Sequence, residues 1–103
     1  MTTKTSDVGD LAAIDQALGQ VIQEIRRERG LSQENLSFNS GLHRTYISLI
    51  ERGKRSPTLS TLVKLAAALN VLPSEILRRF ESRIGWSAVN STVAGRDDEN
   101  HPS

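Results

Sequence analysis

One stretch, Gln33 to Arg52 (QENLSFNSGLHRTYISLIER), constrains the fold more than any other part of the chain. Gly41 stands ninth from Gln33, where a tight turn between two short helices needs a residue without Cβ strain. The apolar positions around this turn are Leu36, Leu42, Ile47 and Ile50. The last two are three residues apart and therefore share one helical face. The stretch predicts two short helices that pack their apolar faces on a common core.

The side chains left on the outer face of the second helix are hydrogen-bond donors: Arg44, Thr45, Ser48 and Arg52. A helix with an apolar back and a donor-rich front, held by a short preceding helix, suits insertion into the major groove of DNA. The guanidinium fork of Arg44 matches O6 and N7 of guanine, so Arg44 is the candidate for direct base reading. The alternative for Arg44 is contact with phosphate alone. Thr45 and Ser48 either bind bases or phosphates or are ordinary surface hydroxyls.

The rest of the chain predicts three more helices. Apolar residues from Leu18 to Ile25 recur at helical spacing, which indicates a helix from about Asp15 to Arg29 that stops at Gly30. Helix-start and helix-stop residues then predict four segments: from the N-cap Ser32 to the turn at Gly41, from about His43 to Arg52 before Gly53, from the cap Thr58 to near Asn70, and from Pro73 toward Gly85. No run alternates as a strand does. The fold class is therefore all-α, with five helices.

The charge is unevenly distributed along the chain. Between residues 18 and 80, ten Lys and Arg stand against five Asp and Glu, a net charge of +5, whereas each flanking segment has a net charge of −2. A basic core with acidic ends fits a nucleic-acid partner, and a mixed solvated surface is the alternative. We expect residues 1–14 to be a flexible lead, 15–84 the domain, and 85–103 an acidic, disordered tail.

Several classes of function find no support in the sequence. The chain has no cysteine, and no apolar run approaches the roughly 18 residues of a membrane span. His43 and His101 lie far apart without the neighbours of a metal site, and no phosphate loop, carboxylate pair or nucleophile motif is recognisable. We therefore expect a cytoplasmic protein that is not an enzyme, with no cofactor, no metal, no small-molecule ligand and no membrane partner.

Four motifs together resemble the lambdoid phage repressor and Cro family, also called XRE-type helix-turn-helix regulators: RRERGLSQ (26–33), SGL (40–42), YISLIERGKRSP (46–57) and LVKLAAALNVLPSEIL (62–77). The run GLHRTYISLIERGKR more narrowly resembles controller proteins of restriction-modification systems. The resemblance covers residues 18–80. It implies a compact five-helix domain that binds double-stranded operator DNA, commonly as a symmetric dimer.

The resemblance also implies roles for particular residues. Gln33 matches a phosphate-contacting Gln, and Arg44 and Thr45 match the first base-reading positions. Tyr46 and Arg55 match positions that contact backbone or bases, and Arg52 and Lys54 match the loop that approaches the sugar-phosphate strand. Such a basic loop would supply salt-sensitive affinity; a merely solvated loop is the alternative. Arg26 and Glu51 match a structural ion pair between the first and third helices.

Some positions depart from the family or stay open. Ser37 and Ser40 replace apolar residues, so each hydroxyl needs a backbone acceptor. Leu49 stands where a polar residue is usual and offers an apolar contact to a thymine methyl. His43 either caps its helix or contacts phosphate, and the ring of Tyr46 is either structural or presents its hydroxyl to phosphate.

The apolar stripe of the last helix, continued by a tryptophan, is a candidate dimer surface: Leu77, Phe80, Ile84 and Trp86. Its alternative is internal core. A dimer would place two recognition helices about 34 Å apart, which implies a palindromic operator. The function predicted from the sequence is therefore a dimeric transcriptional regulator, most simply a repressor. Two alternatives stay open: an antitoxin or restriction-modification controller that regulates its own operon, or a fold used only to bind a partner protein.

Overall fold

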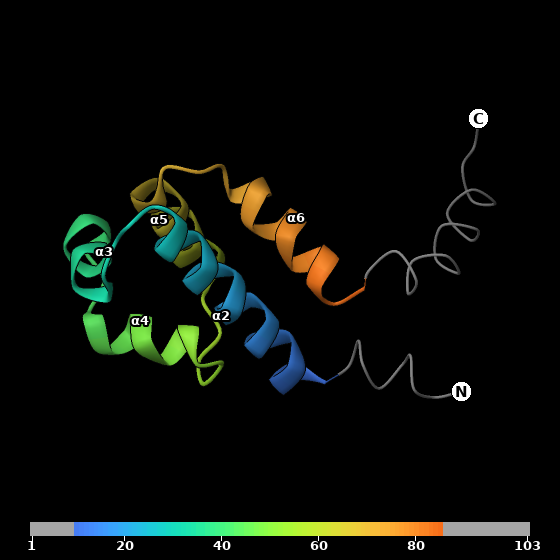
Figure 1. Ribbon diagram of the computed structural model, residues 1–103. Helices are drawn as coiled ribbons and strands as arrows, with labels where there is room; N and C mark the ends of the chain where they lie inside the picture. Colours follow the sequence, from blue (N-terminus) through green and yellow to red (C-terminus); the bar gives the residue numbers. More distant parts are fainter. Residues whose placement is uncertain (1–9, 86–103) are drawn as a thin grey trace, which may run out of the picture.

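Five α-helices and no strand make up residues 10–85, the part of the chain that the computed structural model describes (Figure 1). The helices are α2 (Leu11–Glu28), α3 (Gln33–Ser40), α4 (Arg44–Glu51), α5 (Leu59–Leu69) and α6 (Pro73–Arg83). The predicted all-α class is confirmed. Trp86 and the predicted C-terminal tail beyond it lie outside the described residues.

Most helix ends follow the local chemistry that predicted them. The Ser32 hydroxyl accepts the backbone N–H of Asn35, and the Thr58 hydroxyl accepts that of Thr61, as N-caps do. Gly41 has a φ of 75° and Asn70 a φ of 60°, the left-handed conformation that ends a helix. Pro73 opens α6 at its first position. These short signals fix four of the five helices to within about two residues.

The predicted start of the first helix, near Asp15, is wrong by four residues. α2 begins at Leu11, where the carboxylate of Asp10 accepts the N–H groups of Ala12 and Ala13 at 3.1 and 3.3 Å. Leu11, Ala12 and Ala13 are exposed and Ile14 is half-buried, yet Leu11 and Ile14 continue the apolar helical spacing that leads to Leu18. Asp10 itself was the signal that could have placed this end, because Asp is a preferred N-cap.

The core is formed by aliphatic side chains from all five helices. Its fully buried large members are Val21, Ile22, Ile25, Leu36, Ile47, Ile50, Leu65, Leu69 and Ile76. Helix α2 lies between α4 and α6 and packs against both, while α3 packs against α4 and α5 (Figure 1). Since α4 buries one stripe in this core, its opposite face is turned to solvent.

Helices α2 and α4 approach each other closely at Gly19, a residue that was not predicted to matter. A Cβ at this position would overlap the carbonyl oxygen of Ile50 and lie 2.8 Å from that of Glu51. Both atoms belong to backbone, which cannot move aside as a flexible side chain does. The absence of a side chain at Gly19 therefore sets the distance between α2 and the C-terminal end of α4.

The substitution Gly19→Ala is expected to lower the free energy of unfolding by about 1–3 kcal/mol, the usual cost of overpacking. This sign is opposite to intrinsic helix propensity, by which Ala gains about 1 kcal/mol over Gly. Urea unfolding measures the difference. Gly30→Ala is the matched control, because a Cβ there meets no atom within 4 Å and only its φ of +70° is strained. A smaller loss for Gly19→Ala than for the control would contradict the close-contact account.

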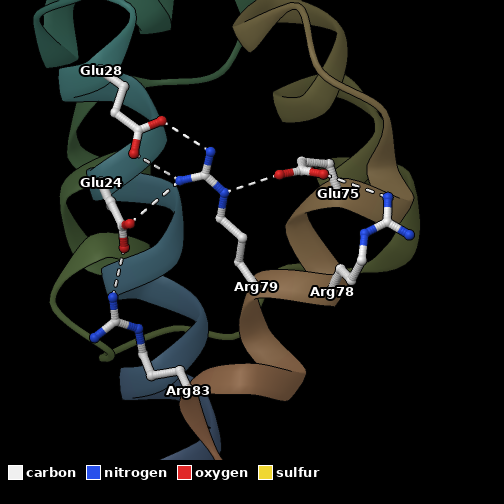
Figure 2. Close-up of polar contacts among 6 residues, drawn as sticks. All are labelled: Glu24, Glu28, Glu75, Arg78, Arg79 and Arg83. Atoms are coloured by element: carbon white, nitrogen blue, oxygen red, sulfur yellow. Dashed lines mark hydrogen bonds and ion pairs between the residues drawn. The ribbon is translucent and has the colours of Figure 1, made fainter.

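An ion cluster joins α6 to α2 (Figure 2). The Arg79 guanidinium donates to Glu28 at 2.8 and 2.9 Å, to Glu75 at 3.1 Å and to Glu24 at 3.3 Å. Arg83 donates to Glu24 at 2.6 Å, and Arg78 reaches Glu75 at 3.4 Å. Arg78 and Arg79, which the count over residues 18–80 assigned to the basic segment, are thus paired with acids inside the domain.

Removal of the central arginine tests this cluster through its pH dependence. The hydrogen bonds and charge of Arg79 lower the pKa of the Glu28 and Glu75 carboxyls below their usual 4.5. A carboxyl with a lowered pKa stabilises the folded state above its unfolded pKa and loses that contribution as pH falls through the folded value. Arg79→Met is therefore expected to lower Tm at pH 7. The decrease should be only a few degrees, because these groups are partly exposed to solvent.

The difference in Tm between Arg79→Met and wild type should be constant from pH 5 to 7 and should shrink below about pH 4.5. Thermal unfolding followed by circular dichroism over this range measures it. Arg78→Met is the comparison: the Arg78 side chain is 64% exposed and its one contact, with Glu75, also lowers the pKa of that carboxyl, so the same pH trend is expected with a smaller difference in Tm. A Tm difference for Arg79→Met that is unchanged at pH 3 would exclude the ionic origin.

Candidate nucleic-acid interface

Helix α4 separates an apolar face from a polar one. Ile47 and Ile50 are at most 1% exposed, whereas Arg44 and Thr45 near its start are exposed. Ser48, one turn after Arg44, is half-buried. The structure therefore presents the predicted donors on the side of α4 that faces away from the core.

The turn between α3 and α4 satisfies the two serines that depart from the family pattern. Ser37 Oγ donates to the Leu42 carbonyl at 2.6 Å, and Ser40 Oγ donates to the Ser37 carbonyl at 3.4 Å while accepting the Leu42 N–H at 3.2 Å. The predicted need for backbone acceptors is thus met inside the turn. These bonds fix the angle at which α4 leaves α3.

A shallow hollow of about 210 Å³ lies between the first residue of α3 and the outer face of α4. Its lining residues are Gln33, Arg44, Thr45 and Ser48. The structure thereby brings together four predicted contact residues that are up to fifteen positions apart in the sequence. The hollow is lined by hydrogen-bond donors and one fixed positive charge, a composition that suits an anion such as a phosphate oxygen.

The segment after α4 adds three more basic residues beside this face. Arg52 Nε donates to Ser48 Oγ at 3.3 Å, and the Arg55 guanidinium lies 5.3 Å from the centroid of the Tyr46 ring, a cation–π contact. The Tyr46 ring also packs against the core, so its structural role is present. Within residues 10–85, no ion pair involves Arg44, Arg52, Lys54 or Arg55. These four charges stay uncompensated, unlike those of α6.

Two further predicted contacts, His43 and Leu49, do not line the hollow. His43 is exposed at the N-cap position of α4, but its side chain makes no capping hydrogen bond. The capping interpretation is therefore correct for position and wrong for the side chain. Leu49 is half-buried.

Beneath the hollow, Arg26 and Glu51 form the predicted ion pair between α2 and α4. Arg26 Nε donates to Glu51 Oε2 at 2.7 Å and Nη2 to Oε1 at 3.1 Å, while Nη1 donates to the Leu31 carbonyl at 2.7 Å. The Glu51 side chain is fully buried and that of Arg26 is 10% exposed. Glu51 Oε1 also accepts from Gln33 Nε2 at 2.9 Å and from Gln23 Nε2 at 3.4 Å. Sequence reasoning missed both glutamine contacts, because they depend on how three helices cross.

A model of the helix-turn-helix family matches residues 22–76, more than half of the chain. The chain belongs to this family. A curated relative, the control protein C.SmaI of Serratia marcescens, is 47% identical over 66 residues, which are 64% of this chain and 79% of the relative.

Two solved structures of helix-turn-helix proteins are similar to this fold. The restriction-modification controller protein C.AhdI from Aeromonas hydrophila is 45% identical, has a TM-score of 0.59, and is matched over 60% of this chain and 94% of its own. The controller protein C.Esp1396I, solved as a tetramer in complex with its natural 35 base-pair operator, is 35% identical with a TM-score of 0.65. That match covers 69% of this chain and 93% of the other.

The predicted apolar stripe of the last helix is divided in the structure. Phe80 packs against the core and Ile84 is half-buried, whereas Leu77 is 40% exposed. Other exposed aliphatic side chains on α5 and before α6 were not predicted: Leu59, Val63 and Leu72. Leu59 and Val63 are four apart on one face of α5, a spacing that the sequence did contain.

Residues 10–85 hold no group of three His, Asp or Glu side chains arranged to bind a metal ion. In the same range no single helix is long and apolar enough to cross a membrane. Helices α5 and α6 reach that length and apolarity only as a pair, which is bent by 105°.

Removal of one partner of the buried ion pair should destabilise the fold, because the other charge stays buried. Arg26→Met is expected to lower the free energy of unfolding by about 3–5 kcal/mol, because it leaves the Glu51 carboxylate buried without compensation. The double variant Arg26→Met/Glu51→Leu should recover most of this loss, since it removes both charges. Guanidinium unfolding of the two variants and wild type checks the order. A double variant no more stable than Arg26→Met would argue against an electrostatic role.

Proposed function

We propose that this chain regulates transcription by binding operator DNA in a sequence-specific manner as a dimer. One observation carries the proposal: the outer face of α4 joins the N-terminal end of α3 in a donor-lined hollow that includes Arg44. Three more basic side chains follow α4, and none of the four forms an ion pair among the described residues. Similarity to a controller protein solved on its operator supports the same function.

Within that function we assign base reading to the exposed start of α4. Arg44 is exposed and can extend its guanidinium to the O6 and N7 atoms of a guanine. Thr45 and Ser48 add hydroxyls on the same face, and Leu49 offers an apolar contact to a thymine methyl. A helix in the major groove reads bases chiefly with its N-terminal residues, and Arg44 and Thr45 are the first two residues of α4, which supports this assignment.

We assign contacts with the sugar-phosphate backbone to the residues around that face: Gln33, His43, Tyr46, Arg52, Lys54 and Arg55. Gln33 is the first residue of α3, where the positive end of the helix favours a phosphate. Arg55 rests on Tyr46, so the loop cation is held beside α4 before DNA arrives. The cationic contacts should make binding salt-dependent.

The proposed dimer uses the exposed apolar side chains of the last helices. Leu77 is the exposed member of the predicted stripe, and Phe80 beneath it connects that surface to the core. Ile84 and Trp86 complete the predicted interface, the latter lying outside the described residues. A two-fold dimer would present two α4 helices about one DNA turn apart, and so requires a palindromic operator.

The similarity to control proteins favours one narrower role, the controller of a restriction-modification operon. In that role the protein would act by occupying DNA in the cytoplasm rather than by catalysis. If the fold served only to bind a partner protein, the chain would have no affinity for DNA. Selection of bound sites from random DNA distinguishes this alternative.

Selection of bound sites from random DNA should enrich a palindromic consensus. Arg44→Ala is expected to degrade that consensus at one position in each half-site, with a loss of about 1–3 kcal/mol of discrimination there. Arg78→Ala is the matched control, because it removes one arginine from α6 and should leave the consensus intact. Failure of the wild-type protein to enrich any sequence would refute the proposed function. An unchanged consensus with Arg44→Ala would refute only the assignment of Arg44.

A further inference from the structure

The buried carboxylate of Glu51 is connected to the donor-rich hollow through the Gln33 side chain. Its Oε1 atom accepts three donors: Arg26 Nη2 at 3.1 Å, Gln23 Nε2 at 3.4 Å and Gln33 Nε2 at 2.9 Å. Gln33 is half-buried, lines the donor-rich hollow, and is the only one of these three that does so. The buried ion pair and the hollow therefore share one amide group.

We propose that Glu51 is a positioning residue for DNA backbone binding, because it orients the Gln33 amide so that its second N–H faces a phosphate in the hollow. The inference rests on the proposed function and adds to it a residue that never touches DNA. No other hydrogen bond of the Gln33 side chain is present among residues 10–85, so that second N–H is available to a ligand.

The physical reason is the chemical asymmetry of the amide. Gln33 can present either its NH₂ or its carbonyl oxygen to a neighbour, and an ionised carboxylate accepts only the NH₂. The contact with Glu51 Oε1 thus selects one of the two amide orientations before DNA binds. With the opposite orientation the carbonyl oxygen would be the group left to face the phosphate, and two acceptors repel.

The same arrangement explains why a buried carboxylate is tolerated close to a phosphate site. Arg26 binds both carboxylate oxygens, through Nε and Nη2, and so neutralises the charge of Glu51. A hydrogen bond to a charged acceptor is stronger than one to a neutral acceptor. The pair therefore holds Gln33 firmly without adding net negative charge beneath the hollow.

The first test is a double-mutant cycle on affinity for the selected operator, with Gln33→Met, Glu51→Gln and both together. In Glu51→Gln the amide oxygen stays with Arg26 and its NH₂ faces Gln33, which reverses the Gln33 amide. Each single variant is expected to weaken binding roughly tenfold, the effect of one lost hydrogen bond to a charged group. The double variant should be no weaker than Gln33→Met alone, because Glu51 acts through Gln33.

The salt dependence of affinity separates positioning from a general loosening of α4. Gln33 is neutral, so its loss should lower affinity at every salt concentration with an unchanged slope of log K against log salt. Displacement of α4 would also remove contacts of Arg44 and Arg52 and reduce that slope. Gln23→Met is the matched control: it removes a donor from the same Glu51 oxygen, lies outside the hollow, and should leave affinity unchanged.

A second measurement uses the wild-type protein and needs no variant to fold. Nuclear magnetic resonance resolves the two side-chain amide protons of Gln33. One should have the chemical shift of a hydrogen-bonded proton in the free protein, and the chemical shift of the other should move when operator DNA binds. Two Gln33 amide protons whose chemical shifts do not move on operator binding, independent effects of the two substitutions, or a reduced salt slope would each overturn the inference. Absence of any operator affinity in wild type would instead refute the proposed function.

Discussion

The placement of α4 depends on the bidentate contact between Arg26 and Glu51. It joins α2 to the last residue of α4, and through the Leu31 carbonyl it also ties down the loop that leads into α3. Removing two charges from water is costly, so such a pair is weak evidence for stability by itself. The pair instead restrains orientation, because the bidentate geometry of the guanidinium group favours one rotation of α4 relative to α2. At the described residues every buried side-chain nitrogen and oxygen has a partner, so this network is complete.

The positions of the charged residues in the fold, rather than their sum, indicate where a polyanion could bind. By itself, the net charge of +5 across residues 18–80 does not distinguish a protein that binds nucleic acid from one with a mixed solvated surface. The structure divides these charges into two populations. Arg79 faces the acids of α2 and joins α6 to that helix, as Arg83 does from just beyond this range (Figure 2). The basic residues of α4 and the following loop meet no acid among the described residues. The second population is the one available to a polyanion.

Features set by local chemistry could be predicted from the sequence, whereas those set by the way helices pack across one another could not. Ser32, Gly41, Thr58 and Pro73 act within one turn of the chain, so their roles could be assigned from identity alone. Gly19 and Gln33 are different, because what they do depends on the backbone carbonyls of α4 and on Glu51, many residues away. The Arg26–Glu51 pair was available beforehand only through family resemblance. The first turn of α2 was predictable from two local signals, the N-cap Asp10 and the apolar spacing of Leu11 and Ile14.

The two ways in which α4 is held have different consequences for reading DNA. Ile47 and Ile50 decide which face of α4 is buried, but hydrophobic contact is non-directional and tolerates small shifts along and around the helix axis. Hydrogen bonds to bases are lost with shifts of that size, since they need donor and acceptor within about 3.2 Å. The directional constraints come from the ends: the serine-rich turn fixes the start of α4, and the ion pair with the Gly19 contact fixes its end. A helix of eight residues held at both ends presents Arg44 at a defined height and angle, which apolar packing alone would not provide.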